Sequence, residues 1–107
     1  MINENTPAVD SKKYITDIKV KLSEAITKVI QSKKLKQSEV QEILDIKQPR
    51  VSDLMNGKVD KFSIDSLLEY LNKIGYCLDV ELNNSTKNPV SMKMKQKLRK
   101  TAWFKLN

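Results

Sequence analysis

The residues with the most informative chemistry are two lysines, Lys36 and Lys47, which stand where two short helices are predicted to begin. A helix N-terminus has free N–H groups and a positive dipole end, so a lysine there supplies no acceptor and adds unfavourable charge. Relative to serine or threonine, each lysine is expected to cost about 1 kcal/mol of stability. A bound anion reverses that preference, because the N–H groups, the dipole and the ammonium all favour it. Both helix starts are therefore predicted to face a phosphate-bearing ligand; surface lysines that are merely tolerated are the alternative.

The composition narrows the functional class. The chain has 107 residues, no histidine and a single cysteine, Cys77. Without histidine, the usual general base, the Ser–His and Cys–His pairs and most metal sites are missing. One cysteine makes neither a disulfide framework nor a multi-thiolate zinc site. We therefore expect a binding protein and not an enzyme, with no catalytic residues, no metal and no cofactor.

The net charge of +7 is unevenly distributed. Residues 1–85 hold equal numbers of acidic and basic groups, so the whole excess lies in residues 86–107. We interpret that segment as a basic arm on DNA or a partner-binding segment, in preference to a helix packed on the body. Its cations and its aromatic pair are Lys87, Lys93, Lys95, Lys97, Arg99, Lys100, Lys105, Trp103 and Phe104.

No apolar run is long enough for a membrane span, and the first residues do not resemble a secretory signal. These features predict a cytoplasmic protein with no membrane partner.

The spacing of apolar residues predicts four helices. The first covers about residues 14–33, and two short helices follow on either side of a tight turn at 45–47. A fourth helix covers 64–74 and ends at Gly75. Each of the last three starts with hydrophobic residues at the two positions of a hydrophobic staple, which fixes the angle of chain entry. The staple pairs are Leu35 and Val40, Ile46 and Val51, and Phe62 and Leu67.

After Gly75 the period changes to two, which predicts a strand with Tyr76, Leu78, Val80 and Leu82 on one face. The sequence offers no second convincing strand, so we expect this strand to pair with its copy across a dimer axis. The predicted organisation is a disordered segment at 1–13, a DNA-binding and dimerisation domain at 14–83, and a linker with a basic tail at 84–107.

The run LKQSEVQEILDIKQPRVSDLMNGKVDKFSIDSLLEYLNKIGYCLDVEL resembles the Xre-type, lambda-repressor-like helix-turn-helix family. Within it, the chain looks most like the branch of HigA-like antitoxins and small regulators. The resemblance covers about residues 15–82. It implies a mainly α fold of four to five helices, with one C-terminal strand paired across a dimer.

The resemblance also implies that the third helix lies in the DNA major groove, where glutamine pairs with adenine and arginine with guanine. The alternatives are a solvated helix start for Gln48 and an Arg50–Asp53 salt bridge. The implied base contacts are Gln48, Pro49, Arg50, Ser52 and Asp53. The implied contacts with the DNA backbone are Lys36, Gln37, Lys47, Asn56, Lys58 and Lys61.

The resemblance therefore implies a homodimeric transcriptional repressor of a palindromic operator. We interpret it as the antitoxin of a toxin–antitoxin operon that represses its own operon, with a toxin as protein partner; the alternative is a stand-alone regulator. Two residues depart from the family pattern. Gln41 replaces the usual alanine where the two short helices cross. Its side chain must either tilt outward or make a hydrogen bond inside the crossing. Asp45 replaces the usual glycine at the turn.

Overall fold

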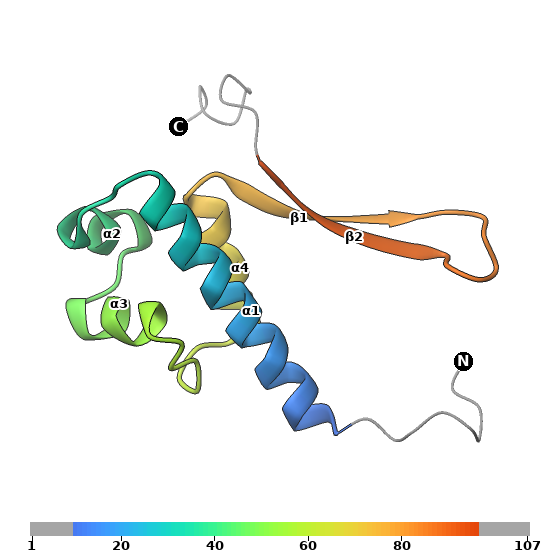
Figure 1. Ribbon diagram of the computed structural model, residues 1–107, viewed down its shortest axis with the longest axis horizontal. Coiled ribbons are helices and arrows are strands. Elements are labelled where there is room, and N and C mark those ends of the chain that lie inside the picture. The colour runs from blue at the N-terminus through green and yellow to red at the C-terminus, as the bar shows by residue number, and fades with distance from the viewer. Residues whose placement is uncertain (1–9, 97–107) are drawn as a thin grey trace.

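The computed structural model describes residues 10–96, which form four helices followed by a two-stranded antiparallel hairpin (Figure 1). This mainly helical architecture and its four helices confirm the prediction. The elements are α1 (Ser11–Ser32), α2 (Gln37–Leu44), α3 (Gln48–Met55), α4 (Ile64–Lys73), β1 (Tyr76–Leu82) and β2 (Val90–Gln96).

Helix α1 begins earlier than predicted, because an aspartate caps it. Asp10 Oδ1 accepts hydrogen bonds from the backbone N–H groups of Lys12 (3.1 Å) and Lys13 (3.4 Å). The predicted disorder of residues 1–13 is therefore wrong for 11–13, which form the first turn of α1. Residues 1–9 lie outside the described part of the chain.

One apolar core joins the four helices. Its most deeply buried side chains are Ile26 of α1, Val51 and Leu54 of α3, and Leu67 of α4, each with no exposed surface. Helix α1 packs against α3 and α4, and α2 packs against the same two helices, α3 and α4. This arrangement fixes α3 by its inner side and leaves its outer side free to carry a site.

The three helix starts follow the predicted register. The N-cap residues are Lys36, Lys47 and Ser63, and the fourth residue of each helix is buried, as the staples require. Asp45 ends α2 in the left-handed conformation with φ of 58°, the geometry that glycine usually supplies at such a turn. The aspartate therefore keeps the tight turn despite the departure from the family pattern.

The prediction of a single strand that pairs only with a second copy is wrong. Strand β1 has the predicted bounds, but its antiparallel partner is β2 of the same chain. The register opposes Tyr76 to Gln96 and Leu82 to Val90. A loop of residues 83–89 closes the hairpin, and Asn83 N–H donates to the carbonyl of Pro89 at 2.8 Å. The predicted linker and tail at 84–107 therefore contains an ordered strand.

The second strand uses part of the basic tail. Lys95 Nζ lies 2.9 Å from Asp79 Oδ2 on the polar face of the hairpin, and Lys93 stands opposite the same aspartate in the register. The hydrogen bond with the Asp79 carboxylate raises the pKa of Lys95 above its usual value. Three of the tail's seven cations therefore belong to the hairpin, Lys93 and Lys95 in β2 and Lys87 in the loop, while residues 97–107, with Trp103 and Phe104, lie outside the described residues.

Within residues 10–96, no helix combines the length and the apolar character that a membrane crossing needs.

Candidate nucleic-acid interface

The turn between α2 and α3 sets the two short helices at a fixed angle. Ile46 N–H donates to the carbonyl of Gln41 at 3.1 Å, which closes the last turn of α2. The Ile46 side chain packs against the core immediately before Lys47 begins α3. Three residues, 45–47, thus suffice to pass from one helix to the next, as a helix-turn-helix motif requires.

The first turn of α3 is exposed, and the opposite side of the helix is anchored in the core. The side chains of Gln48 and Pro49 are exposed, whereas Val51 and Leu54 on the opposite side are buried. Proline is well suited to this first turn, because its fixed φ matches the helix and its missing N–H would have no helical partner there. The predicted readers Gln48 and Pro49 therefore project into solvent from a helix whose inner side cannot shift easily.

The caps of α2 and α3 differ from that of α4 as the sequence predicts. At α4, Ser63 Oγ accepts a hydrogen bond from Ser66 N–H at 3.1 Å. At α2 and α3, neither lysine side chain makes a capping bond, and both are exposed. Glu39 Oε1 accepts from the backbone N–H of Lys36 at 2.7 Å, which satisfies the cap residue itself. The lysine ammonium has no lone pair to offer the helix start.

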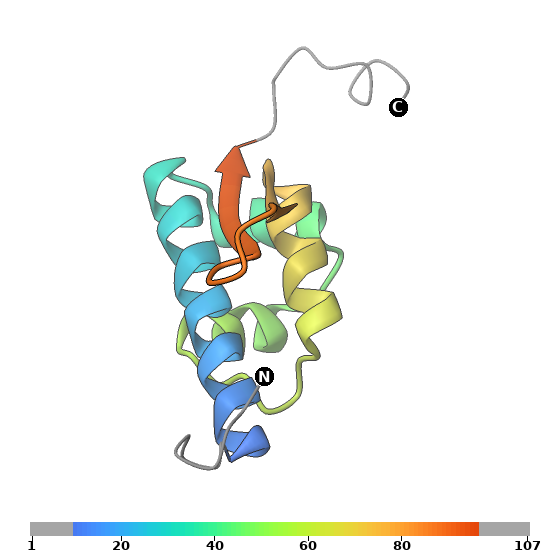
Figure 2. The ribbon, with the colours of Figure 1, turned by 90° about the vertical axis from the view of Figure 1, so that its right-hand side faces the viewer.

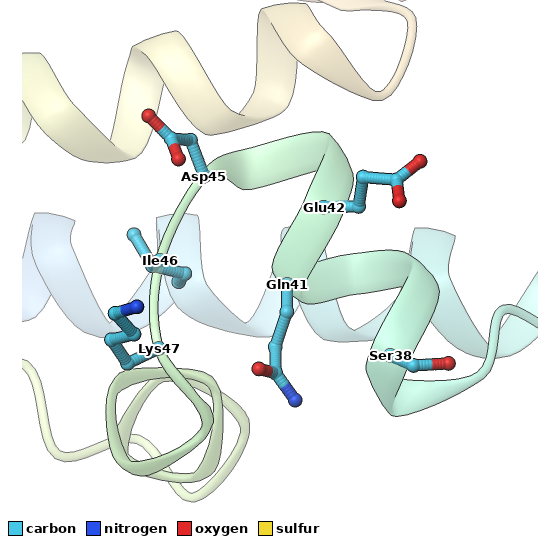
Figure 3. Close-up of a pocket in the computed structure, with 6 residues that line it drawn as sticks. All are labelled: Ser38, Gln41, Glu42, Asp45, Ile46 and Lys47. Atoms are coloured by element: carbon cyan, nitrogen blue, oxygen red, sulfur yellow. The ribbon is translucent and has the colours of Figure 1, made fainter.

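The N-terminal ends of both helices border one groove, shown in Figure 3. Ser38, in the first turn of α2, and Lys47, the cap of α3, both line it. Gln41 is half-buried and points from α2 into this open space, so it tilts outward as one of its two predicted arrangements requires. Glu42 and Asp45 also line the groove, and Figure 3 shows their side chains pointing away from Gln41.

Arg50 points towards the connection between α3 and α4. Its Nη1 donates to the carbonyl of Lys61 at 3.0 Å, and its guanidinium carbon lies 5.1 Å from the centre of the Phe62 ring. Phe62 in turn meets Tyr70 edge to face, with ring centres 6.0 Å apart. Burial raises the pKa of Tyr70, and the positive charge of Arg50 opposes that rise. This arrangement differs from the Arg50–Asp53 salt bridge that sequence reasoning offered as the alternative to base contact.

The remaining predicted contacts lie on α3 and just after it. Ser52 and Asp53 are half-buried, and the Asn56 side-chain amide donates to the Ser52 carbonyl at 2.9 Å. Lys58 and Lys61 are exposed in the connection to α4. Lys58 N–H donates to the Asp53 carbonyl at 2.8 Å, so this connection is tied back to the end of α3.

Sequence reasoning missed the Arg50–Phe62 stack. Phe62 was identified only as a staple residue, although an aromatic ring 12 positions after an arginine was visible in the sequence. Nothing in the residue spacing places the two side chains together, because the contact depends on how the chain turns after α3. Among residues 10–96, no group of histidine, cysteine or carboxylate side chains is arranged to hold a metal ion.

The lysine caps can be tested by replacement. Lys36→Thr combined with Lys47→Ser is expected to raise the free energy of unfolding by about 1 kcal/mol per site, because each hydroxyl accepts from a free N–H group. The same variant is expected to bind DNA more weakly, since both cations leave the helix starts. Urea unfolding and fluorescence anisotropy measure the two effects.

The matched control is Lys33→Ser at the end of α1, an exposed lysine that complements the dipole instead of opposing it. That control should not gain stability. A double variant no more stable than the wild type would show that Lys36 and Lys47 carry no capping penalty.

Comparison with known proteins gives two matches. A family model described as a helix-turn-helix domain matches residues 7–83. A solved structure assigned to the XRE family of transcriptional regulators shares 24% sequence identity, covers 81% of this chain and 93% of its own, and superposes with a TM-score of 0.62. The search of curated proteins gives no match. The family match includes all four helices and β1, so the chain belongs to the helix-turn-helix domain family.

Proposed function

We propose that this protein is a sequence-specific DNA-binding transcriptional repressor. The observation that carries the proposal is the exposed first turn of α3, with Gln48 and Pro49 on a helix whose other side is locked in the core. The lysines at the starts of α2 and α3, whose side chains make no capping hydrogen bond, support it, because a helix start with a nearby cation favours a phosphate ligand. The structural similarity to a protein assigned as an XRE-family transcriptional regulator is consistent with it.

In this proposal Gln48 is the principal reader of bases, because glutamine can pair bidentately with adenine in the major groove. Pro49 packs on a thymine methyl, and Ser52 and Asp53 supply hydrogen bonds one turn further along. The lysines at the helix starts and in the α3–α4 connection, together with Gln37 and Asn56, contact phosphates and position the helix without reading sequence. In this proposal Arg50 holds the α3–α4 connection in place, because its guanidinium already donates a hydrogen bond to the Lys61 carbonyl.

A single copy presents a single α3. We infer that two copies bind a near-palindromic operator, with their recognition helices about 34 Å apart in successive major grooves. The dimer itself is part of the proposal.

Selection of binding sites from random duplex DNA tests the proposal. We expect the full chain to enrich one near-palindromic sequence and to bind it at least ~10³-fold more tightly than random DNA at physiological salt. Enrichment of no sequence, with salt-sensitive binding to all DNA alike, would contradict sequence-specific recognition.

A second candidate function is that of an antitoxin that also represses its own operon. The observation that favours it is an exposed apolar pair at the start of α1, where Tyr14 is 57% and Ile15 is 41% exposed. A basic toxin would be repelled by the basic tail, so this end of α1 is the more suitable docking site. Co-expression with short neighbouring genes, followed by affinity purification, separates the two functions: a stoichiometric partner supports the antitoxin, and purification of the chain alone supports a stand-alone regulator.

A further inference from the structure

The hairpin has one face made almost entirely of apolar side chains. Leu78, Val80 and Leu82 of β1 oppose Met94, Met92 and Val90 of β2 in three cross-strand pairs. We call these six residues the apolar hairpin face. Their exposed fractions range from 37% for Met94 to 78% for Leu82. The opposite face of the same strands carries the polar residues, including the Asp79–Lys95 ion pair.

The helical body leaves this face uncovered. The hairpin projects away from the helices in Figure 1, and in Figure 2, where that side faces the viewer, it stands in front of α1 and α4. At its base, Tyr76 packs against the core, and the apolar hairpin face continues outward from that residue on the same side of β1. The exposed face amounts to on the order of 500 Å², in the range of the largest apolar patch on a soluble monomer, which is often a functional surface.

An isolated two-stranded hairpin has little stability of its own in water. Such a hairpin needs further strands or a packed hydrophobic face to persist. Besides the backbone ladder, the side chains of the two described strands contribute one ion pair on the polar side, so burial of the apolar side is the remaining source of stabilisation. The physical expectation is that this face is buried in the working form of the protein.

We propose that the apolar hairpin face packs against the same face of a second copy of this chain. A flat apolar face is self-complementary across a twofold axis, which is the geometry of an isologous dimer. Two such faces would together bury about 1,000 Å², the lower bound for a specific interface. The charged residues of the two strands, Asp79, Glu81, Lys93 and Lys95, alternate with the apolar ones and lie on the opposite face, so none of them is buried when two apolar hairpin faces meet.

Other arrangements fit these features less well. Pairing between the outer edges of two hairpins would leave the apolar hairpin face in water. DNA offers phosphates and sugars, which an uncharged face of leucine, valine and methionine does not attract. The biological role of this dimer rests on the proposed function, since a dimer would supply the two recognition helices for a palindromic operator. The interface itself does not depend on DNA binding.

Sedimentation of the full chain without DNA tests the interface. We expect a dimer at micromolar concentration, and we expect Met92→Lys to weaken dimerisation at least ~10-fold by placing a charge in the apolar contact. The matched control is Ser91→Lys, which adds the same side chain one residue earlier on the opposite face and should remain dimeric. Circular dichroism verifies that both variants keep the helical body.

Two single-cysteine variants give a second readout, which does not depend on the stability of a lysine variant. In a Cys77→Ser background, a bis-maleimide cross-linker about 10 Å long should join two copies through Val80→Cys, because packed sheet faces lie about that far apart, whereas Glu81→Cys on the polar face should react far less. A wild-type monomer, equal dimerisation by Met92→Lys and Ser91→Lys, or assembly only with a different co-purified protein would each overturn the proposal. A dimer that selects no DNA sequence would instead contradict the proposed function and leave the interface standing.

Discussion

Arg50→Ala is expected to lower the free energy of unfolding by about 1–3 kcal/mol in the absence of DNA. The hydrogen bond is exposed to solvent and contributes about 0.5–1.5 kcal/mol, and an exposed cation–π contact adds about 0.5–1 kcal/mol. Both interactions disappear together, because one guanidinium makes the 3.0 Å bond to Lys61 and the stack on Phe62. Urea unfolding of the free protein measures the loss.

The same variant discriminates between two roles of Arg50 on DNA. If the guanidinium holds the α3–α4 connection, its loss displaces Lys58 and Lys61 and weakens binding to selected and random DNA by the same factor. A loss confined to selected DNA would mean that Arg50 leaves Phe62 and reads a base. A double-mutant cycle with Phe62→Leu, measured by unfolding, should give a coupling energy of at least about 0.5 kcal/mol if the stack is real.

Leu54→Ala is expected to destabilise the domain by about 2–5 kcal/mol, the largest effect of any single replacement in α3. Leu54 has no exposed surface, and its removal opens a cavity where α3 meets the rest of the core. Small domains are stable by only about 5–15 kcal/mol, so this loss is a large part of the total. Thermal and urea unfolding measure it.

The control for Leu54→Ala is Met55→Ala, one residue later on the half-buried side of the same helix. It should cost less, about 1 kcal/mol, because its side chain is only partly buried where it packs against the core. DNA binding by the Leu54 variant should fall only as the folded fraction falls. Equal costs at the two positions would show that α3 is not anchored by its predicted inner side.

Local patterns were sufficient to predict the helical part of the fold. The staples fixed the starts of α2, α3 and α4, because each pairs a hydrophobic residue just before the helix with one a turn inside it. The lysine caps followed directly from that register. The left-handed turn at Asp45 was also predictable, since aspartate tolerates that backbone better than most residues.

The second strand was missed for a physical reason. Strand β2 alternates valine and methionine with serine and lysine, and neither methionine nor lysine favours strands strongly. The alternation is itself a local strand signal, but it was outweighed by this weak propensity, and the pairing with β1 depends on contacts between separate segments. The contacts of the Arg50 guanidinium were also not predicted, because its partners, Lys61 and Phe62, belong to the segment after α3.

The most direct test of the central claim is the effect of Gln48→Ala on the ratio of affinities for selected and random DNA. Gln48 is exposed, so the replacement should change the free energy of unfolding by less than about 0.5 kcal/mol. We expect selected DNA to bind about 1–3 kcal/mol more weakly, with preference relaxed at one base pair per half-site, and random DNA to bind as before. An unchanged affinity ratio would contradict base reading by the first turn of α3.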